Sequence, residues 1–279
     1  MTVSRSFISA EKSDFRARSS ALNHPTTIKN NRWFEEMDIL VINPNTTASM
    51  TLKIGEAARS VALAETNIIA VNPKDGPPSI EGYFDEVFAI PGMIGQMQKH
   101  PSADACVIAC FDDTGLDAAR CASTMPVIGI GEAAFHMASL IAGKFSVVTT
   151  LSRSVPAIEH NLARYGLATR CARVRASDVA VLDLEIPGSD ARRRISEEIA
   201  RAMRDDHAEA IVLGCAGMAD LASSLSKEHG IPVIDGVTAA VKLCESLVAL
   251  GLRTSKLGGY QAPRLKEFQG IFAPFSPAA

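Results

Sequence analysis

Hydrophobic residues gather in eight short runs that are rich in Val and Ile, and longer amphipathic stretches separate these runs. Strands that are buried on both faces of a parallel sheet have this composition and length. The pattern therefore predicts strands over 38–42, 67–72, 105–109, 126–130, 145–149, 170–175, 210–214 and 232–235.

Apolar residues between these runs recur at helical spacing. One stretch places Ile195, Ile199 and Met203 on a single stripe, with charged residues on the opposite face. Another opens on Ser154 as a helix cap with an early proline and closes on Gly166. We predict helices over 47–63, 154–166 and 189–206.

Three pairs of segments match at an offset of 105 or 106 residues, in the same order along the chain. The pairs are DILVINPNT (38–46) with KFSVVTTLS (144–152), DACVIAC (104–110) with EAIVLGC (209–215), and MPVIGIGEAA (125–134) with IPVIDGVTAA (231–240). This spacing indicates two similar halves of about 100 residues each.

Strands that alternate with helices predict right-handed crossovers and parallel sheets covered on both faces. We therefore predict an α/β fold of two similar lobes, each a mainly parallel four-stranded sheet flanked by helices, related by a pseudo-twofold axis. Lobe 1 is expected to span 37–136, with 236–265 returning to it, and lobe 2 to span 137–235. Residues 266–279 are expected to form a tail.

Residues 1–36 are rich in serine and charged residues and have almost no apolar periodicity. We expect a disordered extension, and an upstream mis-assigned start codon explains this segment equally well.

The amino-acid composition disfavours several classes of function. The 279 residues carry a net charge of −3, with 47% hydrophobic and 5% aromatic residues, which is typical of a soluble globular protein and does not favour nucleic-acid binding. No apolar run is long enough to cross a membrane. The six cysteines form no CxxC pair and no nucleotide-binding motif occurs, so we expect no metal and no cofactor. We expect free thiols in the cytoplasm.

Cys110 and Cys215 occupy equivalent places in the two halves, each just past a buried strand. A lone cysteine there is usually a small buried hydrophobe, but a matched pair would face each other across a cleft at the strand ends. Inversion of a carbon centre needs a base on one face and an acid on the other. Helix starts after each cysteine would lower its pKa and present backbone amides to an oxyanion.

The acidic residues Asp112 and Asp113 follow Cys110 directly. Their charge should raise the pKa of its thiol, unless the two side chains turn away to cap the next helix.

Further polar residues stand at predicted strand ends or in the loop PPSIEGYFDE (77–86). They are Asn45, Thr46, Ser79, Thr149 and Thr150. Substrate contact explains them, and helix capping or loop packing explains them equally well.

Six motifs in order resemble the hydantoin racemases of the Asp/Glu racemase superfamily, which also includes allantoin racemases. They are INPNT, SIEGYFDE, ACFDDTGLDAAR, PVIGIGEAA, IVLGCAGM and PVIDGVTAAVKL. The resemblance implies a cofactor-independent enzyme with two lobes. Its two acid/base cysteines match Cys110 and Cys215, and its loop asparagine matches Asn45.

The resemblance also implies that the backbone amides after the two cysteines bind substrate oxygens. These are the amides of Phe111, Asp112, Ala216 and Gly217. Amino-acid racemases of the superfamily typically carry Asn-Thr after the first cysteine, whereas Phe-Asp stands here, which disfavours free Asp or Glu as substrate.

We predict a racemase, and thus an isomerase, that acts on 5-substituted hydantoins or on allantoin and forms a homo-oligomer. Other possibilities are an amino-acid racemase, an arylmalonate-type decarboxylase, a two-lobed binding protein with inert cysteines, and a thiol hydrolase. A decarboxylase needs only one protonating cysteine, and a thiol hydrolase needs a nearby histidine.

Overall fold

The computed structural model describes residues 36–277. Of the expected N-terminal extension only Glu36 is among them, and the last two residues of the expected tail also lie outside the described part. Within 36–277, no helix combines the length and the apolar composition needed to cross a membrane.

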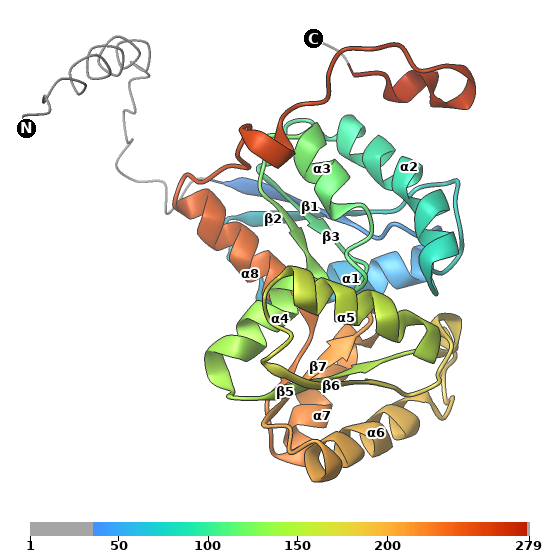
Figure 1. Cartoon of the computed structure of the whole chain (residues 1–279), viewed down its shortest axis with the longest axis vertical. Coiled ribbons are helices and arrows are strands. Elements are labelled where there is room, and N and C mark those ends of the chain that lie inside the picture. The colour runs from blue at the N-terminus through green and yellow to red at the C-terminus, as the bar shows by residue number, and fades with distance from the viewer. Residues whose placement is uncertain (1–35, 278–279) are drawn as a thin grey trace, which may run out of the picture. The chain divides into compact units, whose positions relative to one another are not determined.

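Two parallel sheets form the framework, and both repeat one topology (Figure 1). Sheet A has the order β2-β1-β3-β4, with β1 (Met37–Ile42), β2 (Thr66–Val71), β3 (Ala105–Ile108) and β4 (Val127–Gly129). Sheet B has the order β6-β5-β7-β8, with β5 (Phe145–Thr149), β6 (Cys171–Ala176), β7 (Ala210–Gly214) and β8 (Val233–Ile234). This confirms the predicted fold class, and the observed strands lie within two residues of the predicted ones.

Helices cover both faces of each sheet. In sheet A, α1 (Ala48–Val61) and α8 (Gly236–Ala249) cover one face, and α2 (Tyr83–Lys99) and α3 (Leu116–Ala122) cover the other. In sheet B, the corresponding pairs are α4 (Ile130–Ile141) with α5 (Val155–Arg164), and α6 (Ala191–Asp205) with α7 (Ala222–His229). Short 3-10 helices complete the chain: η2 (Ser152–Ser154), η3 (Val181–Glu185), η4 (Ala216–Leu221), η5 (Gly258–Tyr260) and η6 (Gly270–Phe275).

The helix that follows the last strand of each sheet packs on the other half. Helix α4 follows β4 but contacts β7 and α5, and α8 follows β8 but contacts β3, β4 and α1. Helices α4 and α8 also pack against each other, and Gly236 permits a close approach, because a Cβ there would lie 2.3 Å from the Ile130 carbonyl oxygen.

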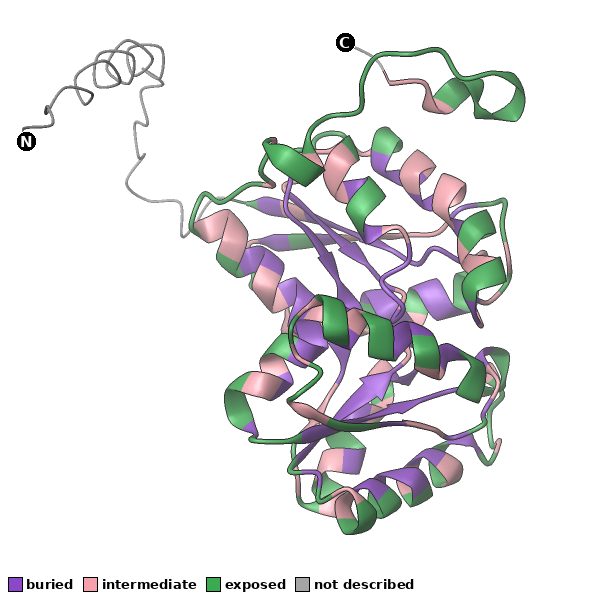
Figure 2. Ribbon diagram, in the orientation of Figure 1, coloured by how far each residue is buried: buried purple, intermediate pink, exposed green. Residues whose placement is uncertain are grey.

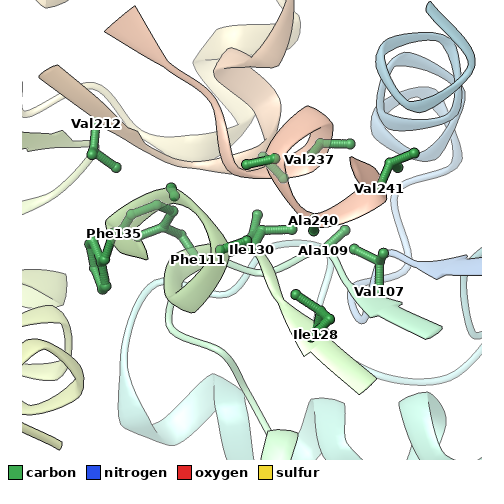
Figure 3. Packing of buried hydrophobic residues seen from close by; sticks show 14 of the residues in the cluster. Val107, Ala109, Phe111, Ile128, Ile130, Phe135, Val212, Val237, Ala240 and Val241 are labelled. Carbon is green, nitrogen blue, oxygen red and sulfur yellow. The ribbon is translucent and has the colours of Figure 1, made fainter. Parts of the chain in front are cut away.

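A central hydrophobic core lies between the two sheets (Figure 3). It joins Val107 and Ile128 of sheet A, Val212 of sheet B, Phe135 of α4 and Val237 of α8. Two smaller cores lie beneath α2 and α3 and beneath α6 and α7. Strands β1, β3, β4, β5 and β7 are therefore buried on both faces (Figure 2), as continuous apolar runs predict, whereas β2, β6 and β8 are partly exposed.

The predicted helix at 154–166 corresponds to α5, but its predicted cap is wrong. Ser154 has a helical backbone (φ −83°, ψ −15°), and its side chain makes no capping hydrogen bond. Helix η2 continues directly into α5, so the first turn does not begin at Ser154. Pro156 lies in the first turn, and Gly166 has a φ of +75°, both as predicted.

Candidate active site

A cavity opens where strands of the two sheets end. The parallel register places the end of β1 beside that of β3, and the end of β5 beside that of β7. Both halves contribute to its walls. Its lining residues are Asn43, Asn45, Met50, Ile80, Ala109, Cys110, Phe111, Asp112, Thr150, Ser154, Val181, Gly214, Cys215 and Ala216.

Cys110 lies two residues beyond the end of β3. The Ala109 amide still bonds to the Ile42 carbonyl at 2.8 Å, so the strand pairing fixes the chain up to this point. A turn follows, in which the Asp113 amide donates to the Cys110 carbonyl at 3.0 Å. The Thr114 hydroxyl donates to Cys110 Sγ at 3.3 Å, which gives the thiol a partner that favours its ionised form.

Cys215 immediately follows β7 and forms the N-cap of η4. Its backbone is extended, and the Met218 amide donates to its carbonyl at 3.1 Å. The Gly217 amide bonds to the thiol and lowers its pKa. The repeat therefore brings both sequence-predicted thiols to one cavity, each after a strand and each beside a donor.

Burial dominates the ionisation of both thiols. It raises the pKa of Cys110 well above its ordinary value, and the charge of Asp112 raises it further. Burial likewise raises the pKa of Cys215 to about 12, and Asp112 adds to this shift. Burial therefore outweighs the lowering of the thiol pKa that we expected from the helix starts. Helix α3 begins only at Leu116, too far along the chain to face Cys110, and η4 is a short 3-10 helix.

The two aspartates after Cys110 point to different partners. The Asp113 carboxylate accepts from the amides of Gly131 at 2.9 Å and Glu132 at 2.8 Å, and from the Tyr165 hydroxyl at 2.7 Å. Asp113 therefore caps α4 rather than the next helix, α3, so the capping alternative is wrong. The charge of Asp112 raises the pKa of Cys110, as expected. Asp112 caps no helix, and its backbone carbonyl accepts from Asn161 Nδ2 at 2.8 Å.

Helix α5 of the second half holds the segment after Cys110 in place. Asn161 binds the Asp112 carbonyl, Arg164 forms an ion pair with Asp117, and Tyr165 binds Asp113. These three contacts span one face of α5. The position of the first thiol therefore depends on an element from the other half of the repeat.

The structure divides the sequence-predicted contact residues into two groups. Asn45, Phe111, Asp112, Thr150 and Ala216 line the cavity together with the two cysteines.

The other four predicted residues do not line it: Thr46, Ser79, Thr149 and Gly217. Two of them have structural partners, since the Thr46 hydroxyl donates to the Pro77 carbonyl and the Thr149 hydroxyl to that of Gly214. Gly217 does not line the cavity, but its backbone amide bonds to the thiol of Cys215, which does.

Several lining residues were not predicted. Asn43 stands in the same NPNTT loop as Asn45, and its amide nitrogen donates to Asn45 Oδ1 at 2.8 Å. Asn43 aligns in the repeat with Thr149, a predicted contact residue, and this alignment could have identified Asn43 as a candidate. Ser154 was assigned to a helix cap, and nothing in the sequence marked Ile80 or Val181.

Metal ligation has no support in this part of the chain. Among residues 36–277, no group of three or more His, Cys, Asp and Glu side chains is placed to hold an ion. All six cysteines are free thiols.

Comparisons with known proteins point to one family. A family model described as Asp/Glu/Hydantoin racemase matches residues 39–244, a span that contains both cysteines. The chain is 48% identical over 241 residues to a hydantoin racemase of Pseudomonas sp. (strain NS671), covering 86% of this chain and 97% of that protein. It is 50% identical over 236 residues to a hydantoin racemase of Rhizobium meliloti, covering 84% and 98%. A solved structure of allantoin racemase from Klebsiella pneumoniae superimposes with a TM-score of 0.85 at 49% identity, covering 87% of this chain and all of that one.

Proposed function

Because this chain belongs to the Asp/Glu/hydantoin racemase family, we propose that it racemises 5-substituted hydantoins by moving the C5 proton between the thiols of Cys110 and Cys215. As a racemase it is an isomerase. The observation that carries the mechanism is that two cysteines, matched by the internal repeat, line one cavity. The names of the curated relatives support the substrate class.

The chemistry follows from the acidity of C5. This carbon lies beside a ring carbonyl, so loss of its proton gives an enolate whose negative charge rests on oxygen. One cysteine acts as thiolate and takes the proton from one face, and the other gives a proton to the opposite face. The roles exchange for the other enantiomer.

Backbone amides stabilise the enolate oxygen in this proposal. The amides of Phe111, Asp112, Ala216 and Gly217 follow the two thiols. The first three residues line the cavity and Gly217 lies behind it, and preorganised amide donors stabilise negative charge best where water is excluded. The ring of Phe111 packs at 5.4 Å from that of Phe135, edge to face, and so anchors this backbone in the central core.

The reactive thiolate is a minor species in the free cavity, because burial and Asp112 raise the pKa of both thiols. The Thr114 hydroxyl and the Gly217 amide oppose this shift. The rate of racemisation is therefore expected to increase with pH through the alkaline range.

Allantoin is the second candidate substrate. It is itself a hydantoin with a ureido group at C5, and a solved structure 49% identical to this chain is an allantoin racemase. The same two thiols would serve both substrates.

The free thiols also bear on the setting of the enzyme. Six unpaired cysteines fit a reducing compartment, so we place the enzyme in the cytoplasm. We propose a homo-oligomer, supported by exposed apolar side chains on α2, among them Phe84 and Val87.

The test is incubation of single enantiomers of several hydantoins and of allantoin in D₂O, followed by optical rotation and by deuterium at C5. We expect loss of rotation together with deuterium incorporation. Cys110→Ser and Cys215→Ser should each reduce racemisation by about 10²- to 10⁴-fold, the usual contribution of an acid/base group. Cys121→Ser, which removes a thiol outside the cavity, is the matched control. Normal turnover in both active-site variants would refute the two-thiol mechanism.

A further inference from the structure

The carboxylate of Asp112 is nearly buried and has no hydrogen-bond partner among residues 36–277. Asp112 is 9% exposed and lines the cavity, and its side chain accepts no hydrogen bond from any described residue. Its neighbour Asp113 contrasts with it, since the Asp113 carboxylate has three donors. Burial of a carboxylate without donors is costly, and a ligand that supplies a donor would remove part of that cost.

Asp112 also contributes to the electrostatics of the cavity. It alone carries a charge among the described lining residues, and no Lys, Arg or His is among them. Its charge raises the pKa of both Cys110 and Cys215, so the carboxylate acts on both thiols.

Burial and two acidic neighbours bring the pKa of Asp112 into the neutral range. Burial, Glu86 of α2 and Asp113 together raise the pKa of Asp112 to about 7. Glu86 itself has a buried carboxylate oxygen without a hydrogen-bond partner in the described chain. Above neutral pH, the cavity therefore holds a carboxylate that has no hydrogen-bond donor and no neighbouring cation among the described lining residues.

We infer that the Asp112 carboxylate is the specificity-determining contact of this site: it accepts a ring N–H of a cyclic ureide and excludes ligands that carry a carboxylate. The inference rests on the proposed function. A hydantoin ring is neutral and carries N–H groups beside its carbonyls, so it supplies the missing donor. An amino acid or a ring-opened ureido acid would instead bring a second negative charge into a cavity without a cation.

N-methylation of the ligand tests the hydrogen bond. Binding of a 5-substituted hydantoin and of its N1-methyl and N3-methyl analogues is measured by calorimetry, with Cys110→Ser in every variant to stop turnover. One methylation should weaken binding by about tenfold or more when Asp112 is present, as expected for a hydrogen bond to a charged group. With Asp112→Leu the same methylation should cost less than about twofold. Asp112→Asn, which keeps the shape, should give an intermediate penalty.

Equal methylation penalties with and without Asp112, at both ring positions, would overturn the assignment. That outcome is distinguishable from failure of the proposed function. A chain that racemises hydantoins but shows equal penalties refutes only the role of Asp112, whereas a chain that binds no cyclic ureide refutes both.

Inhibition by a ring-opened ureido acid tests the exclusion of anions, with the corresponding neutral amide as the matched ligand. In the unsubstituted protein, the inhibition constant of the acid should rise by about tenfold or more between about pH 6 and about pH 8.5, because Asp112 ionises over this range. The amide should change by less than about twofold. Both thiols have pKa values raised above this range, so they do not account for the change.

Three variants complete this experiment. Asp112→Asn should abolish the rise for the acid, and Asp220→Asn, which removes an exposed acid outside the cavity, should leave it intact. Glu86→Gln should shift the rise to lower pH, because loss of its charge lowers the pKa of Asp112. A rise that persists unchanged in Asp112→Asn would contradict the inference.

Discussion

The carboxylate of Asp113 accepts a hydrogen bond from the hydroxyl of Tyr165 at 2.7 Å, across 52 residues of sequence. The bond joins the segment after the first thiol to the end of α5 in the other half of the repeat. Asp113 reaches this position through a left-handed backbone with a φ of 52°. The same carboxylate caps α4, so one side chain couples Cys110, α4 and α5.

Tyr165→Phe should therefore make the position of the Cys110 thiol less fixed, although it removes no group that contacts the substrate. Loss of a hydrogen bond to a buried carboxylate is expected to lower the free energy of unfolding by about 1–3 kcal/mol, measured by urea unfolding. As Tyr165 is a positioning residue, kcat should fall severalfold while KM changes less. Tyr260→Phe, whose hydroxyl donates to the exposed side chain of Asp117, is the control and should cost under about 1 kcal/mol. Equal losses in both variants would argue against a special role for the Asp113 contact.

The equivalent helices α4 and α8 of the two halves are both capped by an aspartate, but from different positions in the chain. In the second half, Asp235 precedes α8 and caps it directly, accepting from the Thr238 amide at 2.9 Å. The equivalent residue before α4 is Gly129, and Asp113 supplies the carboxylate instead. A Cβ at Gly129 would lie 2.1 Å from Asp113 Oδ1, so only glycine leaves room for this arrangement.

Gly129→Ala should displace Asp113 and with it the segment that carries Cys110. We expect a loss of about 2–4 kcal/mol in the free energy of unfolding and at least a tenfold fall in kcat, measured by urea unfolding and by polarimetry. Gly259→Ala is the control, since a Cβ there meets nothing within 4 Å. Gly129→Asp combined with Asp113→Gly transfers the arrangement of the second half and should recover part of the stability. A fully active Gly129→Ala would contradict the coupling.

The strands and the two thiols could be predicted because their signals lie in the pattern of the sequence itself. Each strand is an uninterrupted apolar run, and the repeat aligns Cys110 with Cys215 at the ends of equivalent strands. The roles of Asp112 and Asp113 could not be predicted, because two adjacent aspartates make different contacts. Asp112 lines the cavity, whereas the carboxylate of Asp113 caps α4. The positive φ at Asp113 and a tyrosine 52 residues away decide between them.

Which of the predicted polar residues line the cavity could not be predicted either. Thr149 and Thr150 are adjacent and both buried, yet only Thr150 lines the cavity. Successive residues of a strand point to opposite faces, and a shift of one position cannot be inferred from an apolar run whose two faces are both buried. The walls formed by Ile80 and Val181 come from a loop and from the first residue of the short 3-10 helix η3. Their positions depend on tertiary contacts such as the hydrogen bond from the Val181 amide to Glu81.

The hydroxyl of Thr114 should tune the ionisation of Cys110. It donates to the sulfur at 3.3 Å and lowers the pKa of the thiol, so Thr114→Val should raise that pKa. The measurement is the rate of iodoacetamide alkylation against pH, resolved for each cysteine by peptide mass spectrometry. The midpoint for Cys110 should move to higher pH by about half a unit to one unit, which corresponds to roughly 0.7–1.4 kcal/mol. Cys215 is the internal control, and an equal movement of both midpoints would contradict a direct bond to Cys110.

Asp112 should make the protein less stable at the pH where it works. Its pKa is raised to about 7 in the folded protein, chiefly by burial, against about 3.9 for an unperturbed aspartate. The folded state therefore binds more protons than the unfolded state between these values, and stability falls as pH rises from about 4 to about 7. Asp112→Asn removes this penalty. It should stabilise the protein by about 1–3 kcal/mol at about pH 8 and have little effect near pH 4, which is close to the pKa of the unfolded state and well below that of the folded state.

Urea unfolding of Asp112→Asn at both pH values measures this difference, and Asp220→Asn, an exposed acid, controls for the loss of one negative charge. The same substitution should lower the pKa of both Cys110 and Cys215, since the charge of Asp112 raises each of them. A variant that is more stable and has more acidic thiols, yet binds hydantoins less tightly, would indicate that the charge is kept for substrate recognition at the expense of stability. Equal stability of Asp112→Asn and the unsubstituted protein at about pH 8 would show instead that the carboxylate is solvated or paired in solution.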